Sequence, residues 1–93
     1  MIDSLFSLKG KVIVITGAVG LLGKMHSEVI AKFGGTPVLI DLNKDLVEKE
    51  SNLLQKKYNV PSLGLPVNIT IESQVKLSTK KILDTFGRID GLV

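Results

Sequence analysis

The stretch Lys11-Val-Ile-Val-Ile-Thr-Gly-Ala-Val-Gly-Leu-Leu-Gly23 decides how this chain folds. An apolar, β-branched run enters a loop with three glycines, and the pattern of an amphipathic helix follows. Glycines let a backbone turn sharply, and the first turn of a helix offers unpaired N–H groups to an anion. The stretch therefore predicts a strand–loop–helix unit that binds a pyrophosphate; a tight turn without a ligand is the alternative. The expected contacts are Gly17, Gly20, Leu21, Leu22 and Gly23.

An acidic residue closes the next predicted strand, Thr36–Asp41 (TPVLID). A carboxylate at this place can accept hydrogen bonds from a ribose diol, and we expect Asp41 to contact that sugar. Its neighbour Leu42 is also expected to contact the cofactor. The same carboxylate would repel a 2′-phosphate, and no Arg or Lys occurs between Gly17 and Gly23. The sequence thus favours NAD over NADP as cofactor. The alternative role for Asp41 is to cap the following helix.

Composition limits the classes that this chain can belong to. Ninety-three residues with 44% apolar and 23% charged side chains are typical of one small globular domain. No apolar run approaches the roughly 20 residues that span a bilayer, and residues 1–11 do not resemble a signal peptide. Cysteine is absent, which excludes disulfides and thiolate metal sites. We expect a cytoplasmic protein without a membrane partner.

The net charge of +3 does not indicate a nucleic-acid partner. Most lysines fall on two predicted helices, where acidic residues interleave with them, as on solvated helix faces. Aromatic side chains that could stack on bases are few, with three Phe and one Tyr. His26 has no second ligand at metal-binding spacing, so no metal site is expected.

Apolar runs and helical patterns alternate along the whole chain. Strands are predicted at Val12–Thr16, Thr36–Asp41, 62–69 and 89–93, and helices at 21–33, Lys44–Tyr58 and 71–86. This order predicts an α/β fold, a Rossmann-like parallel sheet with helices on both faces, in partial form: βαβαβα and the start of a fourth strand. Residues 1–93 would form the N-terminal part of a single NAD-binding Rossmann domain.

Local signals define the expected ends and faces of these elements. Asn43 and Thr70 are predicted N-caps, while Gly34-Gly35 and Gly87 are predicted helix stops. Pro66 indicates an edge strand or an irregularity. The predicted buried positions are Leu22, Met25, Val29 and Phe33 on the first helix, Leu46, Val47, Leu53, Leu54 and Tyr58 on the second, and Ile71, Val75, Ile82 and Phe86 on the third.

Four segments in the right order resemble the short-chain dehydrogenase/reductase family over the whole chain. They are Val14-Ile-Thr-Gly-Ala-Val-Gly-Leu-Leu-Gly23, Asp41, Val67-Asn-Ile-Thr70 and Phe86-Gly-Arg-Ile-Asp-Gly-Leu-Val93. The resemblance implies an NAD-dependent oxidoreductase that transfers hydride between NAD and an alcohol or carbonyl substrate. It also implies that Asn68 and Ile69 contact the adenine; an ordinary strand end is the alternative.

The chain departs from the family pattern in three ways. Its glycines are spaced as in the family's nucleotide-sugar-modifying branch, with Leu21 at a usual glycine position, and Asn68 replaces an Asp. The family's catalytic Ser, Tyr and Lys lie later in chains of roughly 250 residues. Tyr58 has no lysine four positions on, so it does not match the Tyr-x-x-x-Lys pair. We therefore expect no catalytic residue in this chain and no turnover by it alone.

Three functional classes follow. The first is the cofactor-binding portion of an NAD-dependent short-chain dehydrogenase. The second is a truncated, non-catalytic module that binds a dinucleotide or associates with itself. The third, indicated only by the glycine spacing, is a nucleotide-sugar epimerase or dehydratase fragment. An open sheet edge at 89–93 and apolar surface on the first and third helices also predict a homo-oligomer.

Overall fold

The computed structural model describes residues 7–93 of the chain. The elements run β1 (Val12–Thr16), α2 (Leu21–Lys32), β2 (Thr36–Asp41), α3 (Lys44–Tyr58), β3 (Leu63–Pro66), α4 (Glu72–Phe86) and β4 (Gly91–Leu92). The N-terminal stretch that we judged not to be a signal peptide lies largely in residues 1–6, outside the described part.

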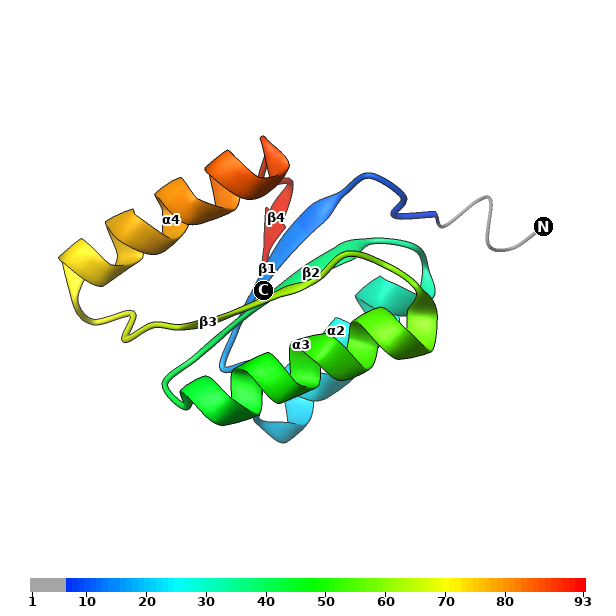
Figure 1. Cartoon of the computed structure of the whole chain (residues 1–93), viewed down its shortest axis with the longest axis horizontal. Helices are drawn as coiled ribbons and strands as arrows, with labels where there is room; N and C mark the ends of the chain where they lie inside the picture. Colours follow the sequence, from blue (N-terminus) through cyan, green and yellow to red (C-terminus); the bar gives the residue numbers. More distant parts are fainter. Residues whose placement is uncertain (1–6) are drawn as a thin grey trace.

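One sheet of four parallel strands has the order β3-β2-β1-β4. Helices α2 and α3 cover one face and α4 covers the other (Figure 1). This confirms the predicted Rossmann-like α/β fold. Its strands end at the same sheet edge, because all four run in one direction.

Strand β1 is buried on both faces and separates two apolar cores. Successive side chains of a strand point to opposite faces, so Val12 and Val14 pack with Ile82 of α4, whereas Ile15 packs with Val47 of α3. Ile15 and Val47 are fully buried. The continuous apolar character of this strand is thus explained by two covered faces.

The buried face of α2 differs from the prediction. Leu22, Met25 and Val29 are 67, 55 and 53% exposed, and Phe33 is a half-buried C-cap beyond the last helical residue. The face that meets the sheet carries Gly23, Ser27, Ile30 and Ala31 instead. Small residues one turn apart let α2 approach β1 closely, and the Ser27 hydroxyl donates to the Gly23 carbonyl oxygen at 2.7 Å. The face of α2 that packs on the sheet is thus the one whose small side chains allow a close approach, and not the one with the apolar stripe.

Helix α3 has the predicted bounds and the predicted cap. The Asn43 side-chain oxygen accepts from the Leu46 N–H at 3.0 Å. Val47 and Leu54 are buried as predicted, and Tyr58 packs partly against the core. The prediction was wrong for Leu46 and Leu53, which are 47 and 50% exposed. Ser51 lies between the two buried residues on the covered face, so this face is narrower than the apolar pattern indicates.

Strand β3 and helix α4 are shorter than predicted. Strand β3 is an edge strand that ends at Pro66, in agreement with the proline signal, and a turn starts after Val67. Helix α4 has Ile71 as N-cap without a side-chain cap, so the Thr70 cap was wrong. Gly87 ends α4 in the left-handed conformation, as predicted.

The buried face of α4 also differs from the prediction. Ile82 is buried and Phe86 packs partly against the core, as expected, but Ile71 and Val75 are 41 and 37% exposed. Ser78 is the other buried position on α4. Only the C-terminal half of α4 therefore places large apolar side chains against the sheet.

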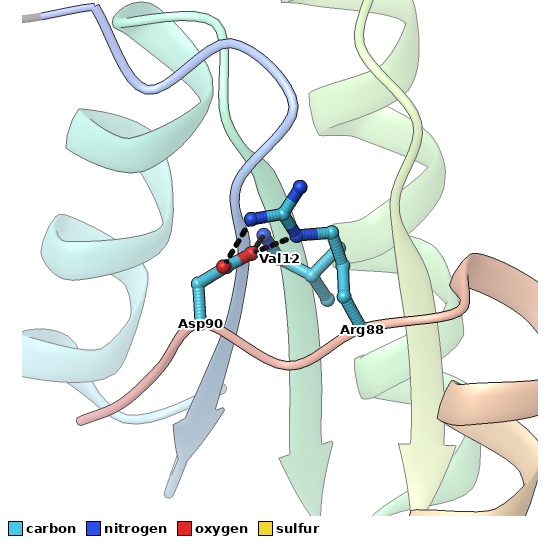
Figure 2. A network of polar contacts seen from close by, with 3 residues as sticks. All are labelled: Val12, Arg88 and Asp90. Atoms are coloured by element: carbon cyan, nitrogen blue, oxygen red, sulfur yellow. Dashed lines mark hydrogen bonds and ion pairs between the residues drawn. The ribbon is translucent and has the colours of Figure 1, made fainter.

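Strand β4 pairs with β1, and a network of polar contacts joins the residues just before β4 to the start of β1. The Asp90 N–H donates to the Val12 carbonyl oxygen at 2.7 Å, and the Val93 N–H donates to the Val14 carbonyl oxygen at 2.8 Å. The Asp90 carboxylate accepts from the Val12 N–H and from the Arg88 guanidinium (Figure 2). The hydrogen-bonded pairing with β1 thus extends from Asp90 to Val93, beyond the two residues of β4.

Candidate functional site

The carboxyl ends of β1, β2 and β3 meet around one cavity of about 260 Å³. Ligands of open parallel sheets bind at this edge, outside the carboxyl ends of the strands. The cavity brings together three segments that the sequence analysis singled out. Its lining residues are Gly17, Ile40, Asp41, Leu42, Val67, Asn68, Ile69 and Thr70.

The glycine loop is folded tightly against the start of α2. Gly17 has φ +61°, a conformation that L side chains rarely adopt. A Cβ on Gly23 would lie 2.2 Å from the Gly17 carbonyl oxygen and 2.7 Å from the Ala18 Cα. No side chain fits at position 23 while the loop keeps this path. This close packing of the loop against α2 therefore requires glycine at position 23.

The first turn of α2 offers unpaired donors. Gly20 is its N-cap and has no side chain, and the first N–H to bond back is that of Lys24, to the Gly20 carbonyl oxygen at 2.9 Å. Within residues 7–93, no hydrogen bond uses the N–H groups of Leu21, Leu22 or Gly23. No acidic side chain lies in this turn. These groups and the helix dipole suit an anion such as a phosphate.

Asp41 lies against the glycine loop. One carboxylate oxygen accepts from the Val19 N–H at 3.1 Å, and the other accepts from the Leu42 N–H at 2.7 Å. The alternative role as a helix cap is wrong, because Asn43 caps α3. A carboxylate has about four acceptor positions, so Asp41 retains capacity to accept from hydroxyl groups of a ligand.

Asn68 forms a local turn at the other wall of the cavity. Its Oδ1 accepts from the Thr70 N–H at 3.0 Å and from the Thr70 hydroxyl at 2.6 Å. Its backbone N–H donates to Gln74 Oε1 at 2.8 Å. Sequence reasoning assigned Thr70 to a helix cap and missed Gln74. The signal for the turn was present, because an Asn side chain commonly bonds the backbone two residues on.

Five of the nine predicted site residues line the cavity: Gly17, Asp41, Leu42, Asn68 and Ile69. The other four are Gly20, Leu21, Leu22 and Gly23, and they lie in the adjoining loop and first turn of α2. Three further lining residues, Ile40, Val67 and Thr70, were not predicted as site residues, although each is next to one that was. A second cavity of about 360 Å³, lined mainly by apolar side chains on the α4 face, shares Ile40, Val67 and Ile69 with the first.

Other site types have no counterpart in the described part of the chain. Residues 7–93 contain no cluster of three or more His, Asp or Glu side chains that could hold a metal ion. Over the same residues, no helix combines the length and the apolar character that a membrane crossing requires.

A parallel sheet with a glycine-rich turn after β1 and a carboxylate at the end of β2 defines a Rossmann-like α/β protein. The family model described as short chain dehydrogenase matches residues 11–93. The chain belongs to this family of oxidoreductases, as the sequence motifs predicted.

Relatives and solved structures agree with this assignment. The chain is 33% identical over 88 residues to the 3-oxoacyl-[acyl-carrier-protein] reductase FabG of Thermotoga maritima, covering 92% of this chain and 35% of that protein. It superposes on an NADPH-dependent 3-quinuclidinone reductase from Rhodotorula rubra with a TM-score of 0.90 at 32% identity, covering 99% and 35% of the two chains. An NAD⁺-bound xylitol dehydrogenase matches with a TM-score of 0.86 at 28% identity, covering 91% and 32%.

The chain spans about a third of the length of these relatives. The structures that it resembles include both an NAD⁺-bound and an NADPH-dependent enzyme. The short-chain dehydrogenase family binds nicotinamide dinucleotides, and membership of the family alone does not select between NAD and NADP.

Proposed function

We propose that residues 1–93 form the N-terminal, cofactor-binding part of a Rossmann domain in an NAD-dependent oxidoreductase of the short-chain dehydrogenase type. The complete protein would act on an alcohol or carbonyl substrate, and the bound nicotinamide cofactor would accept or supply the hydride. The observation that carries the proposal is the contact between Asp41 and the glycine loop through the Val19 N–H. It brings an acceptor for sugar hydroxyls beside donors for phosphates.

The proposed contacts follow the dinucleotide from its phosphates to its base. The free N–H groups of the first turn of α2 suit the pyrophosphate. Because Gly23 has no Cβ, the glycine loop can pack close to that turn. Asp41 and Leu42 would contact the adenosine ribose, and Asn68 and Ile69 the adenine. The phosphate contacts would come from Gly17, Gly20, Leu21, Leu22 and Gly23.

The preference for NAD over NADP rests on charge. A 2′-phosphate on the adenosine ribose would lie beside the Asp41 carboxylate, and no Arg or Lys lies in the glycine loop to offset the repulsion. One of the matched structures is an NADPH-dependent enzyme, so the fold itself allows either cofactor. The preference is therefore a property of Asp41 and not of the fold.

Catalysis is proposed to require chain beyond these residues, since no match to the family's catalytic Tyr-x-x-x-Lys pair occurs in the 93 residues. The chain alone would bind NAD weakly, through the adenosine and pyrophosphate, and would not turn over. Homo-oligomer formation and a cytoplasmic location remain predictions from the sequence. The relatives reported above are reductases and dehydrogenases, which favours this class over an epimerase or dehydratase.

An NMR titration of the ¹⁵N-labelled chain with NAD tests the proposal. We expect the backbone amide signals of Leu21, Leu22 and Gly23 to shift together with those of Leu42 and Asn68. The Asn52 amide, on the exposed side of α3, is the internal control and should not move. Shifts absent from the first turn of α2 would contradict the phosphate site, and hydride transfer by the 93-residue chain would contradict the proposed location of catalysis.

A further inference from the structure

The hydrogen-bonding capacity of the Asn68 side chain is largely used within the protein. A carboxamide oxygen has two lone pairs, and Asn68 Oδ1 accepts two hydrogen bonds, from the Thr70 N–H and the Thr70 hydroxyl. The orientation of the amide follows from chemistry, because the backbone N–H of Thr70 can only donate and must face the oxygen. The amide Nδ2 is therefore the group that Asn68 has left to offer.

Nδ2 carries two donor hydrogens and no acceptor, and no hydrogen bond within residues 7–93 uses it. Asn68 lines the 260 Å³ cavity at the carboxyl end of β3, and is only partly buried there. The neighbouring side chains of Ile40, Val67 and Ile69 make the cavity largely apolar, as a flat base requires.

We infer that Asn68 recognises the base of the bound dinucleotide as a donor only, through a ring nitrogen that flanks the 6-amino group, and not through the amino group itself. This inference rests on the proposed function. The 6-amino group of adenine is a donor, so it cannot form a hydrogen bond with Nδ2, which is also a donor. The ring nitrogens N1 and N7 are acceptors and can. An Asp at this position would have the opposite character, since a carboxylate only accepts. Asn68 stands where the family pattern has Asp, and this difference changes which atom of the base is recognised.

Three analogues of adenosine diphosphate separate the two modes. The purine riboside diphosphate lacks the 6-amino group, the 1-deaza analogue lacks N1, and the 7-deaza analogue lacks N7. For the wild-type chain we expect the purine riboside diphosphate to bind within about threefold of adenosine diphosphate. One of the two deaza analogues should bind about three- to tenfold more weakly, the effect of one hydrogen bond.

The variant Asn68→Asp reverses the pattern. One carboxylate oxygen can keep the Thr70 contacts, and the other replaces Nδ2 with an acceptor, so the turn is preserved while its character changes. Adenosine diphosphate should then bind about tenfold more tightly than the purine riboside diphosphate. The ratio between ligands is the readout, because the added negative charge acts equally on all the diphosphates. Asn52→Asp on α3 makes the same charge change outside the cavity and should leave every ratio unchanged.

Each outcome distinguishes this inference from the function on which it rests. A tenfold loss for the purine riboside diphosphate in the wild-type chain would show an acceptor at Asn68 and overturn the inference. Identical affinity ratios between the ligands in the wild-type chain and in Asn68→Asp would also overturn the inference. The proposed function would remain intact in that case if NAD still displaces adenosine diphosphate. If neither adenosine diphosphate nor NAD binds, the proposed function itself fails, and the inference fails with it.

Discussion

The carboxylate of Asp90 accepts a hydrogen bond from the backbone N–H of Val12 at 2.8 Å, although the two residues are 78 positions apart. Arg88 holds the same carboxylate with its Nε at 2.8 Å and a terminal nitrogen at 2.6 Å (Figure 2). The contact fixes the entry of β4 to the start of β1. The pKa of Asp90 is lowered below its usual value of 3.8, mainly by the Arg88 guanidinium and to a smaller extent by the Val12 N–H.

This pKa shift predicts how the stability of the fold depends on pH. Because the pKa of Asp90 is lower in the native state, the unfolded chain takes up the proton first as the pH falls. The contribution of Asp90 is therefore complete near neutral pH and is lost as the pH falls below about 3.8. Asp90→Asn should be less stable at neutral pH and should lose less stability on acidification, measured by thermal melting across the acid range.

The control for Asp90 is Asp84→Asn, which removes an exposed carboxylate that pairs with Lys80 within α4. Exposed pairs of this kind contribute little, so its melting curve should follow that of the wild-type chain. If the melting temperatures of Asp90→Asn and the wild-type chain fall in parallel as the pH is lowered, Asp90 does not stabilise the β1–β4 contact.

Gly23→Ala should destabilise the chain by about 1–3 kcal/mol or more, since the added methyl group meets backbone atoms that cannot move separately. Its Cβ would overlap the Gly17 carbonyl oxygen at 2.2 Å. Gly20→Ala is the matched control, because a Cβ there lies 3.3 Å from the same oxygen, and should cost less than about 1 kcal/mol. Chemical denaturation measures both, and equal losses would contradict the tight packing of the loop.

Much of this fold could be predicted because strong local signals coincide with the tertiary structure. The continuous apolar run of β1, the Asn43 cap and the Gly87 stop each have one dominant interpretation. The buried face of α2 could not be predicted in the same way. Periodicity identified an apolar stripe, but the contact with the sheet depends on the missing Cβ of Gly23, which only the backbone path of the loop reveals.

The candidate site shows the same division. The position of Asp41 at the end of β2 could be predicted because the end of a strand can be read from the sequence, and in the structure this residue lies beside the glycine loop. The cap assigned to Thr70 failed because its hydroxyl and N–H both bond Asn68, a competition between two local motifs that residue types alone do not decide.

Exposed apolar side chains predict that the 93-residue chain associates with itself at micromolar concentration. Leu22, Met25 and Val29 are more than half exposed along one side of α2, and the outer edge of β4 has no neighbouring strand among residues 7–93. Light scattering should therefore give a mass above that of a monomer. Val29→Glu should lower this mass, whereas Leu53→Glu on α3, at a similarly exposed position, should not. A compact, cooperatively melting monomer would contradict the prediction.

We propose that the Asp41 carboxylate selects NAD over NADP, and calorimetric titration of the chain with the two cofactors tests this role of Asp41. The wild-type chain should prefer NAD. Asp41→Asn, which keeps an acceptor but removes the charge, and Asp41→Ala should both narrow or reverse that preference, since the repulsion of the 2′-phosphate is lost. Asp84→Ala, which removes a carboxylate from the far end of α4, should leave the preference unchanged. The same NAD-to-NADP ratio in the wild-type chain and both Asp41 variants would contradict the account.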